Sequence, residues 1–142
     1  MLFRSVFFEG QVWDAFELLV SLVQRAKKSV LLVDGYTDAG TLNILAKKNE
    51  GVSVTVWTRP KAKLTAKDVE IFNTQYPMLT VLRIDAFHDR LIILDGAEAY
   101  LVGASLKDAG KKAFGITRIE DAETVQAILA RLGRAREDGM QE

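Results

Sequence analysis

Two spacings of apolar residues alternate along the chain, and each predicts one kind of element. Between residues 12 and 28 apolar residues recur at the spacing of one helix face: Val12, Phe16, Leu19, Val20 and Val23. We predict further helices at residues 39–48, at residues 65–76, where Thr65 and Asp68 fit a capping box, and at residues 121–136, with Asp121 as the cap.

Shorter runs rich in β-branched residues and leucine predict strands. They cover residues 6–8, 29–33, 52–58, 79–84, 88–94, 98–102 and 114–119. Asp95 and Gly96 predict a hairpin turn between residues 88–94 and 98–102. Because strands and helices alternate with short connections, the order predicts an α/β domain with a mixed, mostly parallel sheet and helices on both faces. We place this domain at residues 1–136 and expect residues 137–142 to form a flexible C-terminal tail.

The composition narrows the class of protein. With 142 residues, 49% of them apolar, the chain has the size of one compact domain. Lys plus Arg and Asp plus Glu balance at 19 each, so the total charge does not indicate a nucleic-acid binder, although a local basic patch is compatible with it. The absence of cysteine excludes disulfides and thiolate metal sites. No apolar run approaches the roughly 18–20 residues of a membrane span, and residues 1–10 do not fit a signal peptide, so we expect a cytoplasmic protein without a membrane partner.

Polar residues from separate segments are predicted to meet at one edge of the sheet. Sites in such sheets lie at the carboxyl ends of the parallel strands, and here Asp34, Arg59 and Asp85 follow three of those strands. The strand that begins at His88 starts at the same edge, and its hairpin partner ends there, just before Ser105. This convergence predicts a site at that edge.

The single histidine of the chain, His88, lies two positions before Arg90. Because side chains alternate along a strand, we expect both on one face, with the imidazole as nucleophile or acid/base and the guanidinium as a phosphate anchor. Asp95 is expected on the other face, where it orients the local structure.

The segment from His88 to Asp95 reads H-D-R-L-I-I-L-D, and Gly103 to Asp108 reads G-A-S-L-K-D. These segments resemble the H-x-K-x-x-x-x-D and G-S-x-N-like signatures of the phospholipase D superfamily. The order of strands and helices also suits one half of that fold, so the resemblance covers nearly the whole chain. More narrowly, the chain is similar to single-motif phospholipase D-like domains of bacterial and phage-type proteins.

The resemblance implies a metal-independent phosphodiesterase that needs no cofactor. In that family two histidines from two motif copies act together, one attacking phosphorus and the other protonating the leaving oxygen. One motif per chain then implies a homodimer with both copies of His88 near the two-fold axis. The resemblance assigns catalysis to His88, Arg90 and Ser105, with Arg90 and the Ser105 hydroxyl binding the phosphate. We also expect Lys107 and Arg59 to bind phosphate, with DNA or RNA as the partner.

Two departures from the family pattern leave the activity open. Arg90 stands where the motif has lysine, and the motif asparagine has no match around Leu106 and Lys107. The chain is therefore either a divergent phosphodiesterase acting on nucleic acid, or an inactive module that binds nucleic acid or mediates dimerisation. A phospholipid hydrolase or transferase is a weaker third reading.

Several candidate residues also have purely structural explanations. Arg90 could pair with Asp89 or Asp108, and Asp95 is explained by turn chemistry. Asp34 is either a site residue or a structural residue that supports the site. The basic loop around Arg59 is either solvated surface or a contact for a nucleic-acid backbone. We expect structural roles for the remaining residues: Asp38 as a helix cap, and Trp13 and Trp57 in the core.

Overall fold

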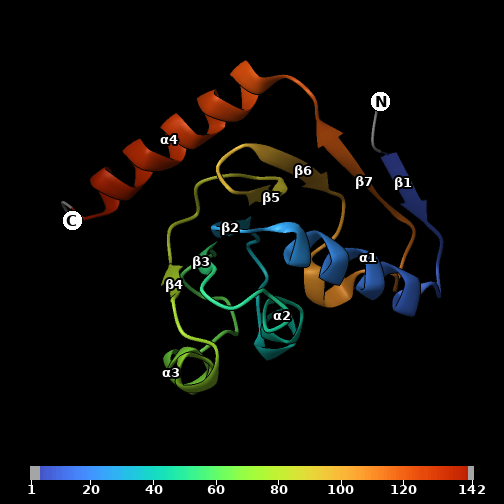
Figure 1. Ribbon diagram of the computed structural model, residues 1–142, viewed down its shortest axis with the longest axis horizontal. Helices are drawn as coiled ribbons and strands as arrows, with labels where there is room; N and C mark the ends of the chain where they lie inside the picture. Colours follow the sequence, from blue (N-terminus) through green and yellow to red (C-terminus); the bar gives the residue numbers. More distant parts are fainter. Residues whose placement is uncertain (1–3, 141–142) are drawn as a thin grey trace.

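A seven-stranded sheet forms the centre of the protein, as the computed structural model shows for residues 4–140 (Figure 1). The strand order is β1-β7-β6-β5-β2-β3-β4. The strands are β1 (Arg4–Phe7), β2 (Ser29–Val33), β3 (Ser53–Trp57), β4 (Leu79–Leu82), β5 (Arg90–Leu94), β6 (Glu98–Val102) and β7 (Phe114–Ile119). The helices are α1 (Val12–Arg25), α2 (Ala39–Leu45), α3 (Ala66–Gln75), the short 3-10 helix η1 (Leu106–Asp108) and α4 (Ala122–Met140).

The sheet is mixed, as predicted, but its pairings are mainly antiparallel. β2 pairs with β3 and β3 with β4 in parallel, whereas β5 pairs antiparallel with both β2 and β6, and β7 with both β6 and β1. The expectation of a mostly parallel sheet is therefore corrected at the level of strand pairing. The reason is that the chain leaves β4 at one edge and returns to the middle of the sheet, where β5 lies against β2 in the opposite direction.

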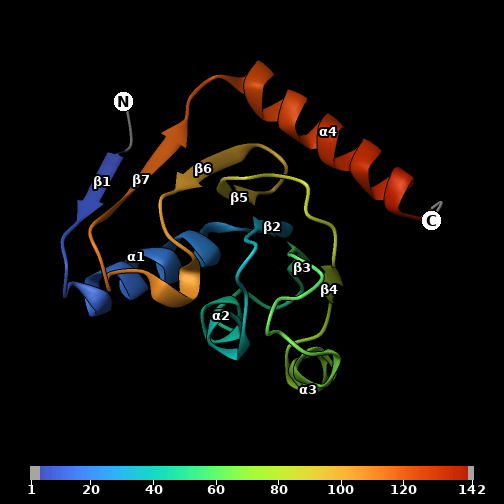
Figure 2. The ribbon, with the colours of Figure 1, turned by 180° about the vertical axis from the view of Figure 1, so that it is seen from behind.

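Helices cover both faces of the sheet, as predicted, with α1, α2 and α3 on one face and α4 alone on the other (Figures 1 and 2). Alternation along the strands separates two sets of buried side chains. Ile92 and Leu94 of β5 point into the larger core under α1 to α3, while Leu91 and Ile93 pack in the smaller clusters that include side chains of α4. Trp57 lies in one of these smaller clusters, as expected of a packing residue.

Three local predictions are wrong. The final helix continues to Met140, so residues 137–140 are helical where a flexible tail was expected, and residues 141–142 lie outside the described part. The strand predicted to begin at His88 begins at Arg90. Trp13 is 66% exposed because the buried stripe of α1 runs through other positions, namely Ala15, Leu19, Leu22 and Val23.

The sheet brings the predicted segments to one rim. β2, β3, β4 and β6 end at this rim, and β5 and β7 begin there, as their registers require. The loop after β6 is fixed against the start of α1, where the Gly10 N–H donates to the Gly110 carbonyl oxygen over 2.9 Å. Gly110 has a φ of +88°, and a Cβ there would lie 2.6 Å from the Cα of Val12, so the contact requires glycine.

Candidate active site

His88 lies in a bend immediately before β5, and its side chain is exposed. Within residues 4–140 it makes no side-chain hydrogen bond and no ion pair. Strand alternation does not fix its orientation relative to Arg90, contrary to our prediction, because His88 precedes the strand. The imidazole is thus open to solvent beside the start of β5.

Arg90 is the first residue of β5 and lies opposite Val102 of β6. Its guanidinium makes no ion pair among residues 4–140, so the alternative pairings with Asp89 or Asp108 are not formed. The guanidinium carbon instead lies 5.7 Å from the centre of the Tyr36 ring, a cation–π distance. A half-buried cation without a carboxylate partner is available to an anion.

Asp34 is the buried acceptor that ties two rim segments together. It follows β2 directly and is 0% exposed. Its carboxylate accepts three hydrogen bonds, from the Tyr36 N–H at 3.0 Å, the Ser105 hydroxyl at 2.9 Å and the Leu106 N–H at 2.9 Å. A buried carboxylate needs such donors, so Asp34 holds the loop after β6 against the loop after β2.

Ser105 is positioned differently from the prediction. We expected its hydroxyl to bind phosphate, but the side chain is 4% exposed and donates its single proton to Asp34. A donor already used in this way is not offered to a ligand. In this arrangement Ser105 positions the loop that carries Lys107.

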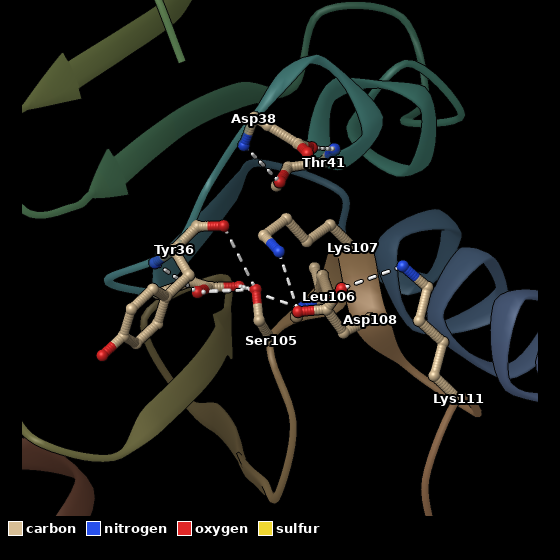
Figure 3. A network of polar contacts seen from close by, with 9 residues as sticks. Tyr36, Asp38, Thr41, Ser105, Leu106, Lys107, Asp108 and Lys111 are labelled. Carbon is tan, nitrogen blue, oxygen red and sulfur yellow. Dashed lines mark hydrogen bonds and ion pairs between the residues drawn. The ribbon is translucent and has the colours of Figure 1, made fainter. Parts of the chain in front are cut away.

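Lys107 extends across the same loop and donates to the Asp108 carboxylate over 2.8 Å (Figure 3). This hydrogen bond raises the pKa of Lys107, and the charges of Asp38 and Asp34 raise it further. The pKa of Asp108 is lowered by the hydrogen bonds from Lys107 and Lys111. Lys107 therefore carries a full positive charge at the rim, partly neutralised by one neighbour.

Arg59 follows β3 and lies over the loop after β2. Its guanidinium donates to the Tyr36 hydroxyl over 2.7 Å, lies 4.9 Å from the centre of that ring, and makes a 3.7 Å ion pair with Asp85. The aliphatic part of Arg59 packs on Gly35, where a Cβ would lie 3.1 Å from its Cγ and Cδ. Tyr36 thus contacts both Arg59 and Arg90, two contacts that the sequence did not predict.

Asp95 lies at the opposite end of β5 from this rim. Its φ is +55° and that of Gly96 is +68°, the sign that a type I′ turn requires. The carboxylate accepts from the backbone N–H groups of Lys27, Lys28 and Ser29, and these hydrogen bonds lower its pKa. Its contacts are those of a structural residue, as the turn chemistry led us to expect.

Comparison with solved structures identifies the architecture. NucT from Helicobacter pylori is similar with a TM-score of 0.69 and 16% sequence identity, covering 96% of this chain and 97% of that one. Nuc from Salmonella typhimurium, a phospholipase D family member, gives the same TM-score and identity over 96% of this chain and 95% of that one. The chain has the phospholipase D-like fold.

The phospholipase D-like fold agrees with the architecture that the sequence resemblance predicted. TrmBL2, an archaeal chromatin protein with a novel mode of DNA binding, is also similar, with a TM-score of 0.61 and 16% identity over 95% of this chain and 52% of that one. No family model matches the sequence, and no curated protein does. The identities of the structural neighbours are low, so their likeness is one of fold.

Two further features of residues 4–140 concern metal-binding groups and membrane-spanning helices. No three His, Cys, Asp or Glu side chains there are grouped so that they could hold a metal ion. None of the helices in this part of the chain combines the length and the apolar character needed to cross a bilayer.

Proposed function

We propose that the chain is a metal-independent phosphodiesterase of the phospholipase D-like type that cleaves nucleic acid through a phosphohistidine at a homodimer interface. One observation carries the proposal. The guanidinium of Arg90 has no ion-pair partner within the described residues 4–140, and it begins β5 two residues after the exposed His88. A phosphodiester bound at Arg90 would place its phosphorus near the one imidazole of the chain.

The reaction takes two steps, with the roles divided between two copies of His88. The neutral imidazole of one copy attacks phosphorus, so that a P–N bond forms while the P–O bond to the leaving alcohol breaks. The protonated imidazole of the second copy gives its proton to the leaving oxygen. Water then attacks phosphorus and loses a proton to the second imidazole, the P–N bond breaks, and both imidazoles return to their starting states.

A homodimer supplies the second imidazole. The chain has one histidine, so a mechanism with two imidazoles requires two chains. In a two-fold dimer the same surface of each chain faces its copy, and the exposed position of His88 at the rim permits such an approach.

Nucleic acid is favoured over lipid because cations line the rim beyond the reacting phosphate. Arg59, Lys61, Lys63 and Lys107 lie around one pocket there, with a single carboxylate, Asp85, among its lining residues. A polymer with one negative charge on each repeating unit would occupy several of these cations at once. The similarity in fold to the DNA-binding protein TrmBL2 is in keeping with this choice.

A second function is favoured by different observations. Arg90 replaces the motif lysine, and the Ser105 hydroxyl donates to Asp34, so two groups expected at the phosphate are changed or already engaged. A phospholipase D-like module that binds nucleic acid without cleaving it, or that serves dimerisation, would keep the rim and lose turnover.

Cleavage of single-stranded and duplex DNA and of RNA in excess EDTA separates the two functions. We expect the wild-type protein to cleave one of these substrates and His88→Ala to lose at least about 10³-fold in rate. Asp89→Asn, a change at the exposed neighbouring residue, is the matched control and should keep wild-type activity. Salt-dependent binding without any cleavage would establish the inactive module instead.

The dimer is tested separately by sedimentation equilibrium and by mixing inactive chains. Wild-type protein should sediment as a dimer. Mixing His88→Ala chains with wild-type chains should reduce the activity below that of the same amount of wild-type chain alone, because mixed dimers lack one imidazole. A monomer of full activity would contradict the two-chain mechanism.

A further inference from the structure

A pocket of about 560 Å³ lies at the rim between the loop that follows β2 and the loop that follows β3. This volume is within the range of small-molecule sites, roughly 300–1,000 Å³. Gly35, Pro60 and Ala62 contribute apolar surface, and the basic side chains of Lys61, Lys63 and Lys107 also line it. The pocket therefore combines an apolar wall with a cationic border.

The charges of this pocket are not balanced by the protein. Arg59 is partnered by Asp85 and Lys107 by Asp108. Lys61 and Lys63 are exposed and make no ion pair within residues 4–140. The border is left with positive charge, which suits an anionic group on the occupant.

One wall of the pocket is a preformed stack of a tyrosine ring and a guanidinium. Arg59 lies over the Tyr36 ring at 4.9 Å and donates a hydrogen bond to its hydroxyl, while the Tyr36 N–H donates to the buried Asp34. Both ends of Tyr36 are thus held, and its side chain is still 48% exposed. Aromatic rings and guanidinium planes are the surfaces on which unstacked nucleobases bind.

Tyr36 also connects this wall to the proposed reaction centre. The guanidinium of Arg90 lies 5.7 Å from the centre of the same ring. An occupant whose base lies against the Tyr36–Arg59 wall would therefore be the immediate neighbour of a phosphate held at Arg90.

We propose that this pocket binds one unstacked nucleotide of a single-stranded nucleic acid, with its base against Tyr36 and Arg59 and its phosphate at Lys61 and Lys63. The inference rests on the proposed function in taking the substrate to be a nucleic acid. A base inside a duplex is paired and stacked, and extracting it costs a few kcal/mol. The pocket thus makes the protein selective for single strands.

Binding is measured in the His88→Ala background, where turnover does not interfere, by fluorescence anisotropy of a labelled oligothymidine and of a matched duplex. We expect tighter binding of the single strand. Tyr36→Ala should weaken it at least about fivefold, the loss of one stacked base, and should change duplex binding far less. Tyr36→Phe, which keeps the ring and loses the hydroxyl, should stay within about threefold of its parent.

Two controls separate stacking from charge. An abasic strand of the same length keeps the phosphates, so it should bind more weakly than oligothymidine and should not respond to Tyr36→Ala. The double variant Lys61→Ala/Lys63→Ala should reduce the slope of log affinity against log salt concentration by the amount expected for about two lost phosphate contacts. Lys67→Ala, in α3 and paired with Glu70, should leave it unchanged.

The outcomes also distinguish this inference from the proposed function. Equal affinity for the abasic and the base-bearing strand would contradict the proposed nucleotide pocket, whatever the cleavage assay shows. So would equal affinity for single strand and duplex both in the protein with Tyr36 and in the Tyr36→Ala variant. Binding of anionic phospholipid vesicles in preference to every nucleic acid would overturn it as well. Single-strand selectivity that depends on Tyr36, in a wild-type protein that cleaves nothing, would support the pocket and refute the phosphodiesterase.

Discussion

The two ends of strand β5 carry the two halves of one sequence motif, and their surroundings are opposite. At the end with Asp95, charged groups are enclosed in hydrogen bonds: Asp95 accepts from three backbone N–H groups, and Glu98 accepts from both Arg25 and Tyr100. At the other end Arg90 makes no ion pair within residues 4–140, and His88 is exposed.

The two ends of this strand therefore differ in what their charged groups can do. A charge that the protein satisfies internally contributes to stability and has little left for a ligand. A charge without an internal partner contributes little to stability but can bind an anion. Changes at the Asp95 end should therefore alter the free energy of unfolding, and changes at the Arg90 end should alter activity.

After the loss expected for His88→Ala, the largest effect is expected at Arg90. Arg90→Ala removes the proposed phosphate anchor and should lower the cleavage rate by about 10²–10³-fold, with the free energy of unfolding changed by less than about 1 kcal/mol. Arg90→Lys restores the residue of the family motif and keeps the charge, so it should retain activity within about tenfold of the wild type. If Arg90→Ala instead lowered the free energy of unfolding and kept the cleavage rate, the two ends of β5 would not differ in the way described.

Asp34 is the exception at the rim, because it is buried and fully hydrogen-bonded there. Asp34→Ala leaves three donors without an acceptor, and we expect a loss of about 3 kcal/mol in the free energy of unfolding. Asp34→Asn, which keeps one acceptor oxygen, should lose less. Urea denaturation of both variants tests this, and a wild-type midpoint for Asp34→Ala would show that the network in Figure 3 does not hold the rim together.

Asp95→Asn isolates the carboxylate from the turn, because asparagine also tolerates the positive φ of this position. We expect a loss of about 1 kcal/mol near pH 7. The pKa of Asp95 is lowered in the folded protein, so its contribution is present above the ordinary value of 3.8 and is lost as the pH falls through the lower folded value. The difference between wild type and variant should accordingly shrink below about pH 4, while cleavage near neutral pH is kept.

The smallest effect is expected at Glu98. Its hydrogen bonds with Arg25 and Tyr100 hold its pKa at about 2, and burial raises the pKa of Tyr100 to about 12 with help from Glu98. Arg25 is more than half exposed, so solvent screens the pair and Glu98→Gln should cost less than about 1 kcal/mol. Thermal unfolding of Glu98→Gln and Asp95→Asn compares the stability that the two carboxylates contribute. A larger loss of stability in Glu98→Gln than in Asp95→Asn would contradict the expected order.

Much of the fold could be predicted because it depends on local patterns. The bounds of β2, β6 and β7 agree with the predicted strands, and the caps at Asp38, Thr65 and Asp121 form as expected. The return of the chain from β4 to the centre of the sheet was not predictable in this way, because it depends on which strand accepts β5 as a neighbour. The motif could indicate the family fold, but the spacing of apolar residues could not indicate the pairing.

The location of the candidate site could be predicted from the sequence, but the contacts between its side chains could not. Convergence of strand ends located the rim, and the motif singled out His88 and Arg90. The contacts of Tyr36 with Arg59 and Arg90 join segments that are distant in sequence, and no local pattern marks such a ring. Ser105 was assigned to phosphate from the motif, whereas its burial beside Asp34 follows from the packing of two loops.

In the proposed reaction His88 carries the phosphoryl group, and this intermediate can be trapped on the protein. Wild-type protein is mixed with an oligonucleotide labelled at its internal phosphates, quenched in alkaline denaturant because phosphohistidine is labile in acid, and digested with trypsin. We expect label on the peptide from Ile84 to Arg90, which contains the only histidine of the chain, and no label in His88→Ala. Cleavage by wild-type protein without label on this peptide, or label that persists in His88→Ala, would contradict it.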